Sequence, residues 1–376
     1  MSTLPQIEDR RAYLAMRSCI QKVATGPEYS KDLSLDEAHE AMGLILEGKA
    51  DPVQAAILLI ALRMKRETDE EFKGALQAVR EATAPTHAAV DELVDVADPY
   101  DGHTRGLPAT PFLPAVLAAL GVPAVTHGLE RVGPKYGITS RKVLRAAGVD
   151  VDLSPAQVAE RIAEPEVGWG YVDQRHYCPP LHGLVPLRAR IVKRPLITTI
   201  EVLVGPLRGR RRTHLMTGYV HKAYPPIYAS LARFSGFDSA AIVRGVEGGV
   251  IPSLKQPAKV FYYHDLGQES SVEIRPQDLD IEQETRAAPL PEDLPPASEA
   301  GDEIATPFDV DVAAECAARA GIEALQGKDG PTRDSLVYGA TIMLHHLRRC
   351  ESRAAGAKAV RAVLDSGKAL AHLHPS

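Results

Sequence analysis

The chain of 376 residues contains few aromatic residues, few cysteines and no long apolar segment. Its four cysteines, Cys19, Cys178, Cys316 and Cys350, are far apart, so the sequence predicts neither a zinc-binding cysteine pair nor a disulfide framework. No apolar run has the length of about 18 residues that a membrane-spanning helix needs. The first residues lack the basic and then apolar pattern of a secretory signal. We therefore expect a cytoplasmic protein, without a membrane partner, whose cysteines are reduced.

Charge is distributed unevenly along the chain. The net charge is −6, yet the segment from Arg188 to Lys222 contains a single acidic residue, Glu201. Its basic residues are Arg188, Arg190, Lys193, Arg194, Arg208, Arg210, Arg211, Arg212 and Lys222. A basic segment in an acidic chain indicates an anionic partner, and guanidinium groups match the geometry of phosphate oxygens. We predict a phosphate-binding segment. The alternative is a solvated basic face that only offsets neighbouring acids.

The first part of the chain carries the signals of a small helical domain. A short helix is expected over residues 10–23. Ser34 with Glu37, and Thr68 with Glu71, have the spacing of capping boxes that open two further helices. Between them, Asp51 followed by Pro52 opens a third. These signals predict an all-helical domain over residues 1–84.

One of these helices is almost entirely apolar. Residues 53–62 read V-Q-A-A-I-L-L-I-A-L, which leaves little polar surface for water. A helix of this kind is either buried in its own domain or covered by another subunit. Because two copies related by a two-fold axis would cover it, we predict a homodimer through the helical domain.

The pattern changes after Pro85. Short strands at 93–96 and 123–126 are each followed by a long loop and then by a helix, at 112–120 and 139–147. Strands that alternate with helices in this way predict a parallel sheet flanked by helices. The fold class is therefore α/β, with a larger domain over residues 85–376. Loops that follow the strands, 98–110 and 127–137, are expected to line a cleft.

The remaining elements extend the same architecture. We expect helices at 154–164 and 224–234, strands at 168–172 and 239–243, and a hairpin of 260–263 with 271–274. Residues 286–308 are dense in Pro, Glu and Ala, which predicts a flexible stretch. Helices are expected at 309–325, 332–350 and 353–373.

Several strings resemble the anthranilate phosphoribosyltransferase family, also called glycosyltransferase family 3. They are the helical opening at 33–63, T-H-G at 126–128, K-Y-G at 135–137, G-P-L at 205–207 and V-R-A-V-L-D-S-G-K-A at 360–369. The resemblance covers about residues 30–373. It implies the fold of nucleoside phosphorylases and phosphoribosyltransferases, and transfer of a phosphoribosyl group. Arg188 matches the family position that contacts the aromatic acceptor; the alternative is a structural arginine paired with a carboxylate.

The chain departs from the family at the residues of the donor site. Family members hold the diphosphate on G-T-G-G-D, where this chain reads A-D-P-Y-D-G at 97–102. Only one glycine remains there, and Pro99 has no N–H to donate. The family motif K-H-G-N-R is replaced here by T-H-G-L-E-R, which adds Glu130. The family's magnesium-binding pair of acids is replaced by V-E-G-G, in which Glu247 is the remaining acid. The resemblance thus implies a degenerate donor site formed by Asp98, Asp101, Gly102, His127, Gly128, Arg131 and Lys135, with Glu247 as a candidate metal ligand. For His127, which follows a strand at the predicted cleft, the alternative is a loop histidine whose hydrogen bonds are satisfied within the protein.

Other strings are similar to a divergent branch of the family, the YbiB-like proteins. They are C-P-P-L at 178–181, the spacing from Cys178 to Arg188 and Arg194, and G-V-E-G-G-V at 245–250. This resemblance implies a homodimer that binds nucleic acid without sequence preference. Tyrosines beside the basic segment could stack on bases; they are Tyr171, Tyr177, Tyr219 and Tyr224. The alternative is that they are residues at the edge of the core.

Three hypotheses follow for function. The first is a nucleic-acid-binding protein on a transferase fold, which needs no cofactor. The second is a divergent phosphoribosyltransferase, which uses phosphoribosyl pyrophosphate, an aromatic acceptor and magnesium, with Arg131, Lys135 and the basic segment as substitute cations. The third is an oligomeric scaffold whose interface is the apolar helix.

Overall fold

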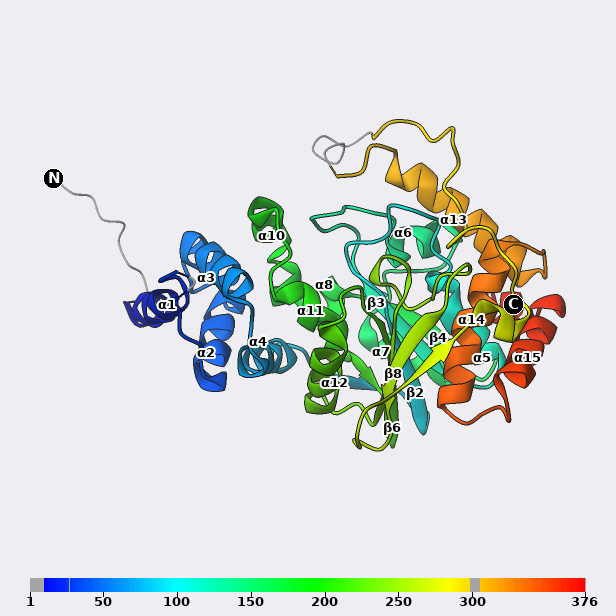
Figure 1. The fold of residues 1–376 in the computed structure, drawn as a ribbon, viewed down its shortest axis with the longest axis horizontal. Helices are drawn as coiled ribbons and strands as arrows, with labels where there is room; N and C mark the ends of the chain where they lie inside the picture. The colour runs from blue at the N-terminus through cyan, green and yellow to red at the C-terminus, as the bar shows by residue number, and fades with distance from the viewer. Residues whose placement is uncertain (1–9, 27, 298–304, 376) are drawn as a thin grey trace.

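The computed structural model describes residues 10–26, 28–297 and 305–375. A bundle of helices forms one end of the molecule (Figure 1): α1 (Arg10–Val23), α2 (Leu35–Leu46), α3 (Pro52–Lys65) and α4 (Asp69–Glu81). Ser34 and Thr68 form the predicted capping boxes, and the Asp51 side chain caps α3. The helical start of the chain is therefore confirmed.

A seven-stranded sheet is the centre of the larger part, in the order β4-β3-β2-β6-β7-β8-β9. Its first five strands are mutually parallel, and the β8–β9 hairpin is added in antiparallel sense. The strands are β2 (Glu92–Ala97), β3 (Ala124–Gly128), β4 (Trp169–Asp173), β6 (Arg212–Gly218), β7 (Ser239–Val243), β8 (Ala258–Tyr263) and β9 (Ser270–Ile274). A small second sheet pairs β1 (Thr86–His87) with β5 (Leu207–Arg208). The mainly parallel α/β architecture is confirmed.

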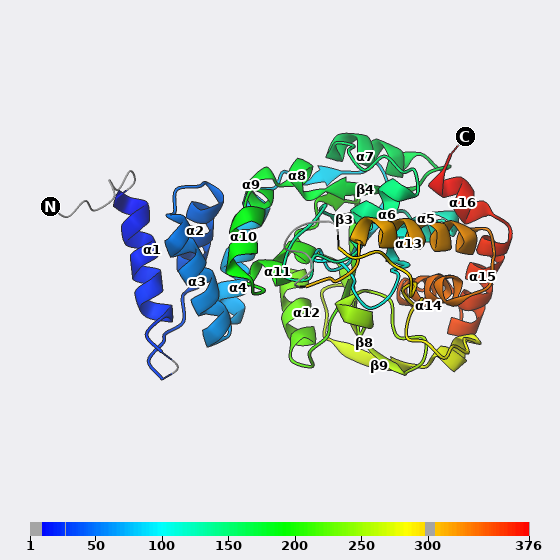
Figure 2. The same ribbon diagram turned by 90° about the horizontal axis from the view of Figure 1, so that it is seen from above.

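Because side chains alternate along each strand, the sheet separates two hydrophobic cores. Val94 and Val96 face one core, and Leu93 and Ala97 face the other. The first core is covered by helices that gather at the end opposite the bundle (Figure 2). They are η1 (Thr110–Phe112), α5 (Leu113–Ala119), α6 (Ser140–Ala146), α13 (Val310–Leu325), α14 (Pro331–His346), α15 (Arg353–Asp365) and α16 (Lys368–Leu373).

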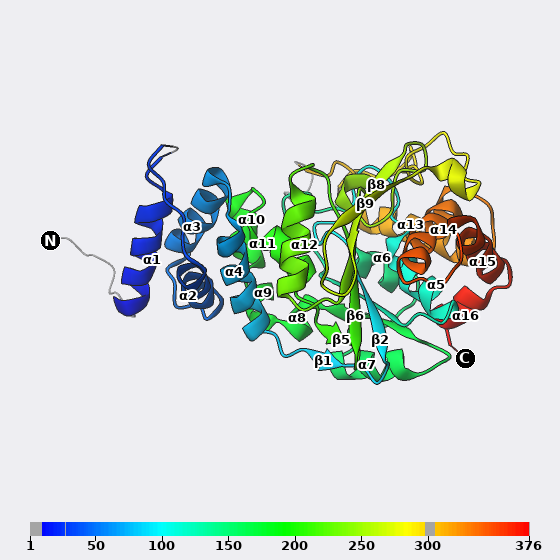
Figure 3. The same ribbon diagram turned by 60° about the horizontal axis from the view of Figure 1, so that its bottom comes forward.

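Between the bundle and the sheet lies a layer of short helices (Figure 3). It comprises α8 (Gln174–Tyr177), α9 (Pro179–His182), α10 (Val185–Ile191), α11 (Ile197–Ile200), η2 (Glu201–Leu203) and α12 (Tyr224–Phe234). With α7 (Pro155–Ala163) and the bundle, this layer completes the second core. Helices from the middle of the chain thus pack against α3 and α4, and the sequence did not predict α8 to α11.

Two short turns complete the chain, η3 (Val246–Gly248) and η4 (Pro276–Leu279). Of the stretch predicted to be flexible, residues 298–304 lie outside the described residues. Its described parts form no helix, and isolated bridges join Leu107 to Ala288 and Pro296 to Phe308. Within the described ranges, no helix is long and apolar enough to cross a membrane.

Candidate functional site

A pocket lies where β2 and β6 end, between the sheet and the short helices. Asp101 follows β2, and Tyr219 follows β6. Arg63 reaches the pocket from α3, Arg194 from the segment after α10, and Glu247 from η3. The carboxyl ends of parallel strands are the usual place for ligands in such sheets. The predicted loop at 98–110 contributes to this pocket, whereas residues 127–137 do not line it.

The turn after β2 is fixed by close backbone contacts. Gly102 has φ of +73°, and a Cβ atom there would lie 2.6 Å from the carbonyl carbon of Gly137. Only glycine therefore fits without strain. Asp98 accepts hydrogen bonds from His103 Nε2 at 2.7 Å and from the Val250 N–H at 3.1 Å. The Asp98 carboxylate thus joins the turn to the loop that carries Glu247.

The carboxylate of Glu247 is surrounded by hydrogen-bond donors. It accepts from the backbone N–H of Thr104 at 3.1 Å, from that of Arg105 at 2.8 Å, and from the Thr104 hydroxyl at 3.2 Å. Burial favours a higher pKa, but His103, Lys135 and these donors together lower the pKa of Glu247. Glu247 also has φ of +56°, in the left-handed region. A backbone site suited to an anion is therefore filled by the chain's own carboxylate.

Asp101 is held by two cations. Arg194 donates to it from Nε at 3.1 Å and from a terminal nitrogen at 2.6 Å, and Lys135 Nζ lies 3.5 Å from it. The same Lys135 atom lies 3.5 Å from Glu247. Among the described residues, no group of three or more His, Cys, Asp or Glu side chains could hold a metal ion. The carboxylates here face protein cations and N–H groups, so these residues do not fit a magnesium site.

His127 lies outside the pocket, in the second core. Its Nε2 lies 2.8 Å from Asp95 Oδ1, and its Nδ1 contacts the hydroxyl of Tyr100, which also contacts Tyr177. Burial raises the pKa of Tyr100 and of Tyr177 well above the ordinary value. This chain of contacts is a buried polar network. His127 therefore does not line the pocket. Its side chain contacts Asp95 of the neighbouring strand β2, which agrees with the alternative of a histidine satisfied within the protein.

Gly128 and Arg131 also make contacts within the fold and lie outside the pocket. Gly128 ends β3, and Arg131 lies over the ring of Tyr136 at 5.0 Å. Neither lines the pocket. Of the residues assigned to a degenerate donor site, the pocket therefore brings together Asp101 and, through its ion pairs, Lys135.

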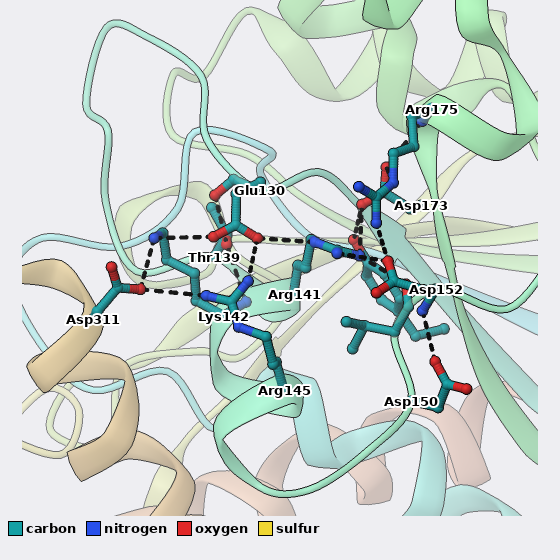
Figure 4. A network of polar contacts seen from close by, with 12 residues as sticks. Glu130, Thr139, Arg141, Lys142, Arg145, Asp150, Asp152, Asp173, Arg175 and Asp311 are labelled. Carbon is teal, nitrogen blue, oxygen red and sulfur yellow. Dashed lines mark hydrogen bonds and ion pairs between the residues drawn. The ribbon is translucent and has the colours of Figure 1, made fainter.

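Glu130 belongs to a polar network beside the sheet (Figure 4). Its carboxylate contacts Arg141, Lys142 and Arg145 of α6 at 2.9, 3.1 and 2.6 Å. Burial alone would raise its pKa, but hydrogen bonds and charges from Arg145 and Lys142 lower the pKa of Glu130 to about 2. Lys142 also contacts Asp311, so the network joins α6 to α13. Glu130 therefore stabilises the fold and does not repel a ligand in the pocket.

Arg188 is a buried structural residue. Its two terminal nitrogens each donate to Glu201 at 2.7 Å, and the Arg188 and Glu201 side chains are 1% and 0% exposed. Gln174 donates to the same carboxylate at 3.3 Å. The interpretation of Arg188 as a ligand contact is replaced by the alternative, a bidentate pair with the one acid of the basic segment.

Arg208 also differs from the prediction. It was assigned to a phosphate-binding segment, but it ends β5, where its guanidinium donates to the carbonyl oxygens of Val204, Gly205, Ser235 and Gly236. It also covers the ring of Phe237 at 4.2 Å. Arg208 thus joins the turn before β5 to the turn after α12, and it is not available to phosphate.

The exposed basic residues form two groups at opposite edges of the sheet. Arg190, Lys193, Arg194 and Lys222 lie on segments at the carboxyl ends of the strands, whereas Arg210, Arg211 and Arg212 lie at the start of β6. Because β6 has seven residues, about 20 Å separates these edges. Arg211 and Arg212 make only exposed ion pairs, with Asp91 and Asp265. The basic segment is thus not one continuous surface along a single edge.

Three of the four tyrosines proposed for stacking are buried. They are Tyr171, Tyr177 and Tyr219; Tyr219 also lines the pocket, together with the partly buried Tyr224. Arg63, which was not among the predicted site residues, donates to the Tyr224 hydroxyl at 2.7 Å. The two residues are 161 positions apart, so no local pattern could have linked them.

Comparison with known proteins identifies the family. Residues 17–83 match the model of the glycosyl transferase family, helical bundle domain, and residues 110–290 match the glycosyl transferase family, a/b domain. An anthranilate phosphoribosyltransferase from Rhodopseudomonas palustris (strain BisB18) is 30% identical over 70% of this chain and 74% of its own length. One from Thermomicrobium roseum is 29% identical over 95% of this chain and 94% of its own.

Two further comparisons bear on the fold and the branch. The solved anthranilate phosphoribosyltransferase of Thermus thermophilus has a TM-score of 0.72 at 24% identity and covers 96% of this chain and 97% of its own, which shows a common fold. An uncharacterized protein of Aquifex aeolicus is 31% identical over 61% of this chain and 68% of its own; it fits the predicted divergent branch. The bundle, the sheet and these matches agree that the chain belongs to the glycosyl transferase family of the anthranilate phosphoribosyltransferases.

Proposed function

We propose that the chain is a divergent phosphoribosyltransferase that binds a phosphorylated pentose donor in the pocket at the ends of β2 and β6. The main support is that Arg63 and Arg194, from separate layers, line the same pocket as the carboxylates Asp101 and Glu247 of the sheet loops, and that Arg194 pairs with Asp101. Phosphoribosyltransferases also align with almost the whole chain. The pocket has a volume of about 170 Å³, which is small for such a donor. The donor therefore binds as its phosphate draws Arg194 away from Asp101 and so enlarges the pocket.

The charges fit the demands of glycosyl transfer. When the bond from the anomeric carbon to the leaving oxygen breaks, positive charge develops on the pentose and negative charge on the leaving group. Arg194 and Arg63 stabilise the leaving group, because guanidinium groups bind phosphate oxygens in a bidentate way. Asp101 orients Arg194 before binding and, once freed, faces the positive pentose. Since the carboxylates do not fit a magnesium site, this proposal includes no metal step.

Calorimetric titration with phosphoribosyl pyrophosphate, in EDTA and then in magnesium, tests the proposal. We expect binding in both, and at least about tenfold weaker binding by Arg194→Gln, because a charged hydrogen bond is lost. Arg190→Gln is the matched control, since Arg190 is exposed in the same segment and does not line the pocket. Absence of heat under both conditions refutes the proposal. Heat in magnesium alone supports the donor site and contradicts the metal-free step.

Nucleic-acid binding is the second candidate, and the exposed arginines at the start of β6 favour it. Arg210 makes no ion pair with a described residue, and those of Arg211 and Arg212 are exposed. Each phosphate contact on duplex DNA adds about 0.9 to the slope of log K against log salt. Changing these three arginines to Ala should lower the slope by about 2.7. The same measurement with Arg190, Lys193 and Lys222 changed to Ala tests whether nucleic acid binds at the other edge of the sheet. No retention of DNA or RNA at low salt excludes this candidate.

A further inference from the structure

A second cavity lies between the β8–β9 hairpin and the turn that joins α14 to α15. Val260, Tyr262 and His264 line it from β8 and the residue after it, and Val272 and Ile274 line it from β9. These positions alternate, so they lie on one face of the hairpin. The volume of about 440 Å³ falls within the range of roughly 300–1,000 Å³ for small-molecule sites. The wall formed by the hairpin is apolar and partly aromatic.

The opposite wall carries cations without carboxylate partners. Arg348 and Arg353 both line the cavity, and neither forms an ion pair with another residue in the described part of the chain. The Nε atom of Arg353 is also buried without a hydrogen-bond partner. By contrast Arg349, between them in sequence, contacts Glu92 at 2.6 Å. A buried guanidinium nitrogen without an acceptor is costly, so an anion from outside would stabilise it.

Histidines supply a flat surface between these walls. The ring of His264 stacks on that of His346 at 4.4 Å, and Tyr262 meets His346 edge-on at 6.3 Å. His346 Nε2 lies 2.8 Å from Ser239 Oγ, which is in turn 2.8 Å from His214 Nδ1. Burial lowers the pKa of His264 and of His345, and it lowers that of His346 to about 3. These imidazoles are therefore neutral near pH 7 and offer flat, weakly polar surfaces.

We propose that this cavity binds a small planar carboxylate with one negative charge and an aromatic or apolar body. Arg348 and Arg353 contribute two positive charges and Glu351 at the rim contributes one negative charge, so the cavity matches a monoanion. The carboxylate pairs with the guanidinium groups, and the body lies against Tyr262, His264 and Ile342. The cavity adjoins Ser239, the first residue of β7, at the edge of the sheet opposite the donor pocket, so this proposal does not depend on the proposed transfer reaction.

Cysteine modification in the unaltered protein tests the location. Cys350 lines the cavity, and Cys316 is an equally half-buried thiol on α13 outside it. With benzoate as the probe, we expect iodoacetamide to modify Cys350 at least about fivefold more slowly, with no change at Cys316, as measured by mass spectrometry. Benzamide lacks the charge and acetate lacks the body, so neither should protect. Equal protection by benzamide, or none by benzoate at millimolar concentration, overturns the proposal.

Substitution tests the residues. Arg353→Gln should weaken benzoate binding about tenfold, because a charged hydrogen-bond partner is removed. Arg349→Gln is the matched control, because it makes the same change of charge four residues earlier at a residue that does not line the cavity. It should bind benzoate like the unaltered chain. Equal effects of the two substitutions would indicate a general surface charge effect and would contradict the proposal. Thermal unfolding of both variants establishes that they are folded.

Discussion

The pair of Arg188 and Glu201 separates a structural role from a ligand-binding role. Arg188→Met keeps an unbranched side chain with most of the volume but removes the guanidinium. Glu201 would then remain at 0% exposure with only the weak hydrogen bond of Gln174. Breaking a fully buried pair by removing one partner costs about 3–5 kcal/mol, since the remaining charge loses its partner and cannot reach water. We expect this loss in the free energy of unfolding.

A double-mutant cycle measures the coupling. Arg188→Met with Glu201→Leu removes both charges and leaves apolar side chains of similar size, a change that is often neutral or stabilising. The double variant should therefore be more stable than Arg188→Met and close to the unaltered protein. Urea denaturation followed by circular dichroism gives the free energies, and the salt dependence of DNA retention is measured on the same proteins.

One outcome would refute this reasoning. If Arg188→Met changed the free energy of unfolding by less than about 1 kcal/mol, while abolishing binding of nucleic acid or of a phosphorylated ligand, Arg188 would be a ligand contact. The bidentate pair with Glu201 would then not persist in solution. If instead stability falls and the salt slope is unchanged, the structural interpretation is correct.

Further predictions concern stability and assembly. Arg208→Ala should lower the free energy of unfolding by about 3 kcal/mol, because four carbonyl oxygens lose a donor. Joint replacement of Arg210, Arg211 and Arg212 by Ala should change the free energy of unfolding by less than about 1.5 kcal/mol. Urea denaturation measures both values. Val53, Ile57 and Met64 are 65%, 44% and 78% exposed, so we expect a homodimer through α3 that Ile57→Glu converts to monomer in sedimentation. Burial keeps the pKa of His346 below its unfolded value, so the folded state binds fewer protons. Thermal stability should therefore be complete above about pH 6.5 and fall as the pH is lowered towards 3; a constant melting temperature over that range would contradict the burial of His346.

Local signals predicted much of the fold. The capping boxes of Ser34 and Thr68 mark helix starts in the structure, and the helix at 224–234 and the strand at 239–243 have the predicted bounds. These elements succeed because their signals lie within a few residues of one another. Strand β6 was missed because its first residue, Arg212, is the last of three consecutive arginines, which were assigned to the basic segment. Helices α8 to α11 were missed because each is too short to show a clear helical periodicity, and because prolines and basic residues interrupt the apolar pattern.

The site was harder to predict, because its contacts join distant parts of the chain. Arg194 and Asp101 are 93 positions apart, and Glu247 and Thr104 are 143 apart. The order of strands and loops indicated that Asp101 and Lys135 lie at one cleft, but only the family resemblance linked Glu247 to them. It gave no means to see that Arg188 has a partner of its own 13 residues away, since a buried pair and an exposed cation have the same local pattern.

The loops around the pocket hold one another in place. Asp98 joins the β2 turn to Val250, Glu247 joins η3 to the N–H groups of Thr104 and Arg105, and Lys135 lies between Glu247 and Asp101. A carboxylate in these positions supplies the negative charge that a bound phosphate would otherwise supply. Glu247 adopts a left-handed conformation that costs about 1 kcal/mol or more in a residue with a side chain, and its several hydrogen bonds offset that cost. Any anion that enters this pocket must therefore compete with carboxylates of the chain itself, so ligand affinity here depends on how readily Asp101 and Glu247 release their partners.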